Sequence, residues 1–123
     1  MNTQQTTLLN AVKQASESWK AGFNSGNAKQ CAAQYESDAV MDARPFGRFE
    51  GRQQIEGFWQ QLINDGFAEV DYIDPQFTVV DDNSVLLTSG WKMNKAQGVI
   101  HKELWCLQAD GSAKLRVDDF EAL

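Results

Sequence analysis

The apolar residues in the first half of the chain recur every three or four positions, the period of a helix that lies on a core. This pattern predicts a long helix over residues 6–23 and a short one over residues 28–36, with Asn27 as the N-cap of the second. A brief apolar strand is predicted over residues 39–43. The helical period returns after Gly51 and predicts a third helix that ends near residue 64.

After residue 66 the pattern changes to the alternation that is typical of β-strands. A first strand over residues 70–79 is predicted to be interrupted at Asp74-Pro75, because proline cannot donate a hydrogen bond within a sheet. Three more strands are predicted over residues 85–94, 99–108 and 114–120. Short turns join them, so we expect a mostly antiparallel sheet.

These later strands carry large apolar side chains on both faces, whereas a sheet with one solvated face shows cleaner polar alternation. The predicted helices can cover only one face of the sheet, so the apolar side chains on the other face must be buried by something else. A second copy of the chain is the simplest one, and we expect a homodimer formed through the sheet. No repeat, linker or low-complexity segment divides the chain, so residues 1–123 are expected to form one domain.

Composition and charge limit the classes of partner that we expect the protein to bind. The chain has 123 residues, of which 42% are hydrophobic, enough to bury a core without disulfides or metal. A formal charge of −6 with scattered basic residues argues against a nucleic-acid partner. No export signal or membrane-spanning run is present, so we expect a cytoplasmic protein with no membrane partner. Cys31 and Cys106 are expected to be reduced, buried thiols.

Four segments carry a resemblance to a known family: YESDAVMDARPFG at residues 35–47, FEGRQQIEGFW at 49–59, GVIHKELW at 98–105 and ADGSAKLRVDD at 109–119. Together with the order of helices and strands, they resemble the nuclear transport factor 2-like superfamily, and within it the SnoaL-like and ketosteroid isomerase-like group. The resemblance covers nearly the whole chain. It implies an α+β fold in which three N-terminal helices pack over a cone-shaped, curved antiparallel sheet and leave an apolar pocket, usually in a homodimer.

The resemblance says less about activity, because this fold hosts isomerases, dehydratases, polyketide cyclases and non-catalytic assembly domains. The isomerase tyrosine that donates to the oxyanion corresponds to Trp19. The isomerase's base corresponds to Ala43, while the adjacent Asp42 points to the opposite side of its strand. Only the second acid has a counterpart, Glu103. Ketosteroid isomerase activity itself is therefore not expected.

Three residues are candidates for acid–base chemistry. His101 and Glu103 are predicted to share one face of a strand with Cβ atoms about 7 Å apart, so that both can point at one ligand. In an apolar pocket either group could act as a base near neutral pH. Asp42 precedes a turn that can reach the mouth of a cavity. The alternatives are a sheet surface or dimer seam for His101 and Glu103, and pairing with Arg44 or Arg48 for Asp42.

A flat apolar ligand is predicted to lie on aromatic residues from converging elements. The predicted ligand contacts are Trp19, Phe23, Tyr35, Phe58, Trp59, Trp105 and Asp118. Of the adjacent Asp118 and Asp119 only one can face inward, and Asp118 fits the register better. The alternative for the aromatic residues is plain core packing. The sequence has no metal-binding spacing and no phosphate-binding loop, so we expect no cofactor.

Two functions remain open at this stage. The first is a cofactor-independent isomerase or cyclase-like lyase that removes a proton next to a carbonyl group of a small hydrophobic molecule. Glu103, His101 or Asp42 would be its acid or base, and Tyr35 or His101 would donate to the oxyanion. The alternative is a non-catalytic ligand-binding or oligomer-assembly module that uses the exposed sheet face.

Overall fold

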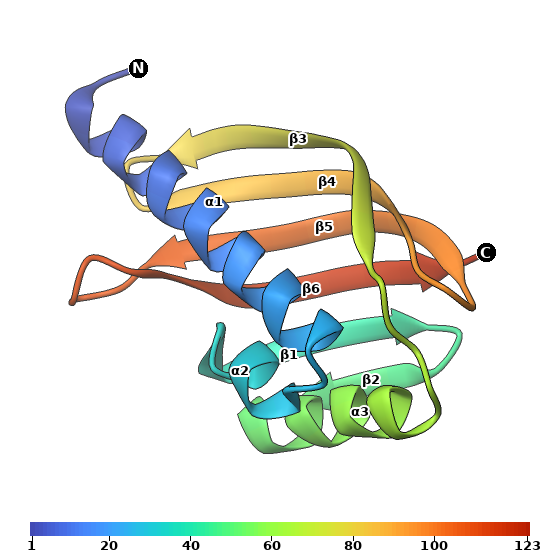
Figure 1. Ribbon diagram of the computed structural model, residues 1–123. Helices are drawn as coiled ribbons and strands as arrows, with labels where there is room; N and C mark the ends of the chain where they lie inside the picture. The colour runs from blue at the N-terminus through green and yellow to red at the C-terminus, as the bar shows by residue number, and fades with distance from the viewer.

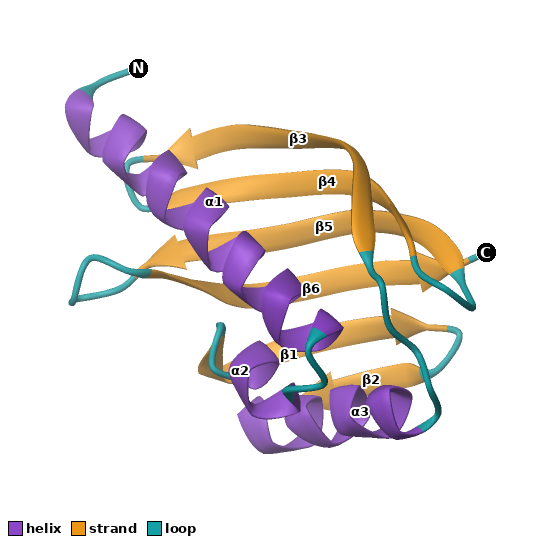
Figure 2. Ribbon diagram, viewed as in Figure 1, coloured by secondary structure: helices purple, strands orange, loops and turns teal.

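The computed structural model describes residues 1–123 and shows three helices over one face of a six-stranded, curved sheet (Figures 1 and 2). The elements are α1 (Thr3–Asn24), α2 (Ala28–Ala32), β1 (Tyr35–Arg44), β2 (Gly47–Glu50), α3 (Arg52–Asn64), β3 (Asp71–Asp81), β4 (Ser84–Lys92), β5 (Gln97–Leu107) and β6 (Ala113–Ala122). The strand order is β2-β1-β6-β5-β4-β3, and only β1 and β6 run parallel. The predicted α+β class with helices over a curved, mostly antiparallel sheet is confirmed.

Helix α1 crosses the inner face of the sheet diagonally (Figure 1). It begins earlier than predicted because Asn2 and Gln5 form a capping box, in which the Asn2 side chain accepts from the Gln5 backbone N–H at 2.8 Å. At its other end the Asn24 side chain bonds the backbone N–H and carbonyl of Val70, at 2.7 and 3.1 Å. These two bonds tie the end of α1 to the segment that leads into β3.

Helix α2 is shorter than predicted, and Tyr35 begins strand β1 instead of ending the helix. The cause is pairing with a distant strand: Tyr35 lies opposite Leu115 of β6, and the Leu115 N–H donates to the carbonyl of Gln34 at 2.8 Å. The Arg52 guanidinium also donates to the Tyr35 carbonyl, at 2.6 and 3.1 Å. Tertiary pairing therefore overrides the local helical period.

The predicted interruption at Asp74-Pro75 is confirmed. The pairing register of β3 with β4 shifts between Ile73 and Gln76, and Asp74 has a positive φ of 54°. Because β3 is an edge strand, the missing N–H of Pro75 leaves no broken bond inside the sheet. The strand bends sharply at this end in Figure 1.

The hydrophobic core lies between the helices and the inner face of the sheet. Cys31 belongs to this core, and Cys106 is buried on β5; both are free, as predicted. None of the three helices combines the length and the apolar character needed to cross a membrane.

Candidate functional site

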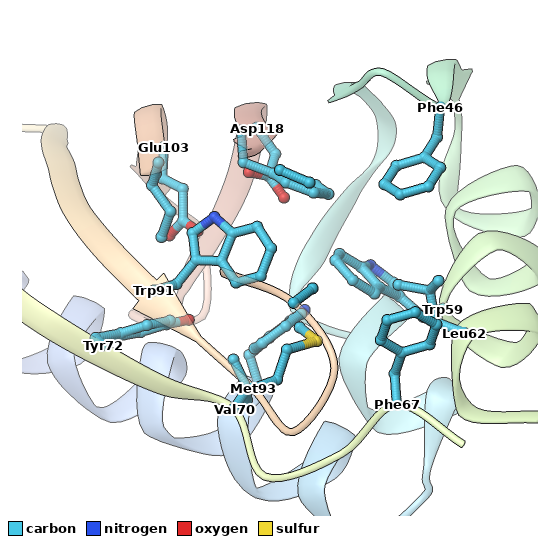
Figure 3. Close-up of a pocket in the computed structure, with 15 residues that line it drawn as sticks. Phe46, Trp59, Leu62, Phe67, Val70, Tyr72, Trp91, Met93, Glu103 and Asp118 are labelled. Carbon is cyan, nitrogen blue, oxygen red and sulfur yellow. The ribbon is translucent and has the colours of Figure 1, made fainter. Parts of the chain in front are cut away.

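An apolar pocket opens between α1, α3 and the inner face of the sheet (Figure 3). Its volume is about 540 Å³ when the space at its open mouth is included. Thirteen of the 15 lining residues are hydrophobic, and the two others are Glu103 and Asp118. The hydrophobic ones are Trp19, Phe46, Trp59, Leu62, Phe67, Val70, Tyr72, Trp91, Met93, Ala96, Ile100, Phe120 and Ala122. A pocket with this apolar lining favours an apolar ligand.

Two loops on one side of the pocket are bonded to each other. The Asn94 side chain donates to the Gly66 carbonyl at 2.9 Å and accepts from the Ala68 N–H at 3.0 Å. The Lys95 ammonium donates to the Asp65 carbonyl at 2.8 Å. These bonds hold the segment after α3 against the β4–β5 hairpin, and both segments contribute lining residues.

Glu103 and Asp118 lie directly opposite each other on β5 and β6. Their side chains face the pocket in Figure 3, and the residues are only 6% and 3% exposed. The Trp105 indole N–H donates to Glu103 Oε1 at 3.0 Å, and the Tyr35 hydroxyl donates to Asp118 Oδ2 at 2.6 Å. The second oxygen of Asp118, Oδ1, is buried without a partner. No Lys, Arg or His lines the pocket.

This environment changes the acidity of both carboxyl groups. Burial raises the pKa of Asp118 to about 7, while the hydrogen bond from Tyr35 opposes the rise. Burial raises the pKa of Glu103 well above its ordinary value, and the neighbouring Asp118 raises it further. The rise in the pKa of Glu103 favours its protonated form, which can donate a hydrogen bond, and Asp118 with a pKa of about 7 can exchange a proton near neutral pH.

Two donors in the pocket wall also lack partners. The indole N–H groups of Trp19 and Trp91 are buried and unbonded, and the two residues are 7% and 6% exposed. Figure 3 shows the indole nitrogen of Trp91 on the side of the ring where the two carboxyl groups lie. Buried N–H groups are seldom left without an acceptor, so these two are unusual features of the pocket wall.

No protein-family model matches the sequence, and no curated protein shows significant sequence similarity to it. Solved structures do match. A scytalone dehydratase-like protein from Novosphingobium aromaticivorans has a TM-score of 0.82 at 12% identity, over 100% of this chain and 89% of that one. A ketosteroid isomerase-like protein from Erwinia carotovora atroseptica has a TM-score of 0.80 at 12% identity, over 100% of this chain and 98% of that one.

A nuclear transport factor 2-like protein of unknown function from Shewanella oneidensis has a TM-score of 0.78 at 11% identity, over 92% of this chain and 98% of that one. The chain has the nuclear transport factor 2-like fold. This agreement confirms the fold that the resemblance of the four sequence segments implied. At such low identity the likeness concerns the fold, and the functions named for its neighbours differ, so the chemistry must be argued from the site.

Within the nuclear transport factor 2-like fold, Tyr35 lies behind the pocket wall. Its ring is fully buried, and its hydroxyl accepts from the Trp59 indole N–H at 3.3 Å while donating to Asp118. Tyr35 was predicted to contact the ligand and donate to an oxyanion. It is not among the lining residues, so in this structure it acts on the pocket through its bonds to Asp118 and Trp59.

The prediction that His101 shares a face with Glu103 is wrong. The pairing register of β5 with β6 shifts between Ile100 and Lys102, which is a β-bulge that adds one residue to the strand. His101 is therefore exposed on the outer face, where its Nε2 lies 2.9 Å from Glu121 Oε1. A bulge leaves the alternation of residue types nearly intact, so sequence alone gave no signal for it.

Asp42 is also placed away from the pocket. Its side chain lies on the outer face of β1 and accepts two hydrogen bonds from Arg48, at 2.8 and 3.1 Å. These bonds from Arg48 lower its pKa, so Asp42 remains ionised and bound to a cation. Asp42 therefore has the alternative role, pairing with an arginine, and not the predicted role at the mouth of the pocket.

The predicted aromatic contacts divide into two groups. Trp19 and Trp59 line the pocket, as does the acidic Asp118, whereas Phe23, Phe58 and Trp105 are buried but do not line it. Phe23 stacks on Trp19 with ring centroids 5.5 Å apart, and Phe58 packs edge-on to Trp59 at 5.0 Å. These three residues support the wall from behind, and no direct ligand contact is assigned to them.

Several lining residues were missed by the sequence analysis. Tyr72 and Trp91 lie opposite each other on β3 and β4, and strand alternation placed Trp91 on the same face as the buried residues of β4. That signal could have found Trp91. Phe46, Phe67 and Met93 lie on turns and loops, for which no periodic pattern exists.

Proposed function

We propose that the protein is a cofactor-independent enzyme that removes a proton next to a carbonyl group of a small hydrophobic molecule, as an isomerase or a cyclase-like lyase does. The observation that carries this proposal is the unpaired Oδ1 of Asp118, buried in an apolar pocket opposite the carboxyl group of Glu103. A base that is desolvated and titrates near neutrality is suited to the weak acidity of a carbon next to a carbonyl.

The two acids have different roles in this reaction. Glu103 holds a proton and donates a hydrogen bond to the substrate carbonyl oxygen, which makes the neighbouring C–H bond more acidic. Asp118 Oδ1 then takes the proton from that carbon, and the electron pair moves to the oxygen to form an enolate. The indole N–H of Trp91 adds a second donor to this oxygen. Return of the proton to another carbon completes an isomerisation, and departure of a β-substituent completes a lyase reaction.

Other side chains prepare the base for this step. The Tyr35 hydroxyl occupies Asp118 Oδ2 and leaves Oδ1 as the reactive atom. The Trp105 indole holds Glu103 Oε1 in the same way. The apolar lining excludes water, which strengthens every interaction between these groups and the developing charge. Structural neighbours described as dehydratase-like and isomerase-like support this class of reaction but leave the substrate open.

The test is deuterium exchange at the carbon next to the carbonyl of 2-tetralone in D₂O, followed by proton NMR. We expect Asp118→Asn to slow the enzyme-dependent exchange about 100-fold or more, and Glu103→Gln to slow it by a similar order. Asp119→Asn is the matched control, because Asp119 is the next residue but lies on the outer face bonded to Arg44. Exchange that is equally fast with Asp118→Asn would overturn the proposal.

Binding of the ketone without any exchange would instead favour the alternative, a ligand-binding module without catalysis. The control and the variants should show the same far-ultraviolet circular dichroism as the unmodified protein, so that lost exchange reports chemistry. Asn and Gln keep the size of the acids that they replace and remove only the titratable group.

We further propose that a second copy of the chain covers the outer face of the sheet. Four half-buried apolar residues lie opposite one another across β1, β6, β5 and β4, namely Val40, Val117, Leu104 and Leu86. Charged residues of both signs flank this row, including the pairs Arg44 with Asp119 and His101 with Glu121. A two-fold contact can match such a face against itself.

A further inference from the structure

We infer that Phe46 is the gate residue of the pocket: the turn that carries it moves outward to admit a ligand, and its ring returns to cover the mouth. The inference goes beyond the proposed function, because a gate serves a ligand-binding module as well as an enzyme. It starts from the position of Phe46, which is the only one of the 15 lining residues that is exposed, at 53%.

The two acids of the pocket are covered in this structure. Glu103 and Asp118 are buried, and the free Asp118 Oδ1 has almost no contact with solvent. A ligand that touches these carboxyl groups must therefore displace part of the wall. Most lining residues belong to the close-packed core, which does not yield easily, so the movable part must lie at the mouth.

Three loops contribute lining residues, and two of them are fixed to each other. The Asn94 N–H donates to the Ala68 carbonyl at 3.0 Å, and the Asn94 side chain accepts from the Ala68 N–H at the same distance. The Lys95 ammonium bonds the Asp65 carbonyl and also lies over the Phe67 ring, 5.6 Å from its centroid. The segment after α3 and the β4–β5 hairpin therefore form one bonded side of the mouth.

The third loop, the turn between β1 and β2, has no such bonds. Its two residues, Pro45 and Phe46, take part in no backbone hydrogen bond. The Phe46 ring packs on Phe58, with ring centroids 5.7 Å apart, and projects from the turn toward the pocket in Figure 3. A Cβ atom at Gly47 would meet nothing within 4 Å, so the space beside the turn is open. This loop can move without breaking a hydrogen bond.

The strands on both sides of the turn are held in place. Arg44 at the end of β1 is bonded to Asp119 of β6. Arg48 of β2 donates two bonds to Asp42 of β1, at 2.8 and 3.1 Å. The movement is therefore confined to the turn, whose ends act as the hinges.

A closed gate has a consequence for the two acids. When the Phe46 ring covers a bound ligand, it keeps water away from the carboxyl groups, and their interactions with the ligand become stronger. Release of the ligand then requires the turn to open again. The residue at the mouth would thus control the rates at which ligands enter and leave.

The first measurement is acrylamide quenching of tryptophan fluorescence in the ligand-free protein. Three of the four tryptophans line the pocket. In Phe46→Ala the mouth stays open, so the quenching constant should rise about twofold or more. Val80→Ala is the matched control, because Val80 is also an exposed apolar residue but lies on the edge strand β3 outside the pocket. Quenching that is equal in Phe46→Ala and the unmodified protein would overturn the inference.

Backbone amide relaxation, measured by NMR, separates a gate from a fixed part of the wall. The amides of Phe46 and Gly47 should show lower order parameters or microsecond-to-millisecond exchange, whereas those of Ala68 and Asn94 on the bonded side should not. Equal rigidity on both sides of the mouth would make Phe46 a fixed wall residue and would overturn the inference. Neither this measurement nor the quenching requires a bound ligand.

Stopped-flow tryptophan fluorescence with 2-tetralone then measures the gate with a ligand present. Phe46→Ala should raise both the association and the dissociation rate constants about fivefold or more, because removal of an ordinary contact mainly speeds dissociation while removal of a gate speeds both. A rise in the dissociation rate constant alone would overturn the inference. These rate constants do not depend on deuterium exchange, so the gate and the proposed enzymatic function can fail separately.

Discussion

Tyr35 donates its hydroxyl hydrogen to Asp118 Oδ2 across 2.6 Å, and the same hydroxyl accepts from the Trp59 indole N–H at 3.3 Å. A hydrogen bond donated to a carboxylate favours its charged form. The bond from Tyr35 therefore lowers the pKa of Asp118, against the larger rise that burial causes. These opposing effects hold the pKa of Asp118 near neutrality, where a general base is most useful.

The first prediction is that Tyr35→Phe raises the pKa of Asp118. With the hydroxyl removed, burial acts unopposed and the carboxyl group holds its proton to a higher pH. The rising limb of the pH profile for ketone exchange, which reports ionisation of the base, should move to higher pH. Exchange rates between pH 5 and pH 9 check this. A limb that stays in place or moves to lower pH contradicts the role of Tyr35.

Trp59→Phe is the control for this variant. It removes the N–H that Tyr35 accepts but keeps the bond between Tyr35 and Asp118. The rising limb of the pH profile should therefore shift less in Trp59→Phe than in Tyr35→Phe. An equal shift would mean that general loosening of the pocket wall is responsible.

The second prediction concerns stability and pH. Because the folded-state pKa of Asp118 is raised to about 7, the folded protein binds this proton more tightly than the unfolded chain does. Its contribution to the free energy of unfolding is fully present below about pH 4 and is lost as the pH rises to about 7.

Asp118→Asn should remove this dependence. Urea unfolding at several pH values from 4.5 to 8 is the measurement, and the informative quantity is the difference in unfolding free energy between the two proteins. The unmodified protein should lose stability relative to Asp118→Asn as the pH rises. Asp119→Asn, which alters the adjacent acid on the outer face, bonded to Arg44, should show no such trend. A difference that stays flat between pH 4.5 and pH 7 would contradict the raised pKa.

The third prediction compares two glycines. A Cβ at Gly98 would lie 1.9 Å from the Glu121 carbonyl oxygen and 2.7 Å from Trp91 Cζ2, closer than real Cβ contacts allow. Gly98→Ala should therefore push β5 away from β6, move Trp91 and destabilise the fold by about 2 kcal/mol or more. Thermal unfolding and tryptophan fluorescence measure both effects.

Gly57→Ala is the matched substitution. Gly57 lies within helix α3, and a Cβ there would meet nothing within 4 Å. Alanine is the better helix former, so this change should stabilise the protein by about 0.5–1 kcal/mol. Equal effects of the two substitutions would contradict the close approach at Gly98.

The order of elements was predictable because each helix and strand has one buried face, and burial imposes the period of that element on the sequence. The errors arise where contacts between distant segments decide. Tyr35 continues a helical period but pairs with Leu115, so it lies in a strand. The spacing of His101 and Glu103 predicts that they share one face of the strand, but a bulge places His101 on the outer face. Neither long-range pairing nor a bulge leaves a local trace in the chain.

The site was predicted only in part for the same reason. Alternation and the family resemblance singled out Glu103 and Asp118 as site candidates, and the structure shows the two opposite each other on neighbouring strands. The alignment of β5 with β6 is a tertiary relationship, so the pairing of the two acids could not be derived from either segment alone. Residues at the pocket mouth such as Phe46 depend on turn geometry, which apolar patterning does not describe.

The last prediction tests the proposal that a second copy of the chain covers the outer face of the sheet. Leu104 lies in the centre of the apolar row, between Leu86 and Val117 on the neighbouring strands. Leu104→Glu would place a charge at this position, where a dimer would have to bury it without a partner. Size-exclusion chromatography with light scattering should show a dimer for the unmodified protein and a monomer for this variant.

Val80→Glu is the control for that experiment, because Val80 is an exposed apolar residue on the edge strand β3, outside the row. It should leave the dimer intact. Leu104 lies on the outer face, so Leu104→Glu should also leave the tryptophan fluorescence of the pocket unchanged. A monomer for the unmodified protein at tens of micromolar, or a dimer that survives Leu104→Glu, would show that the outer face is not the contact between copies.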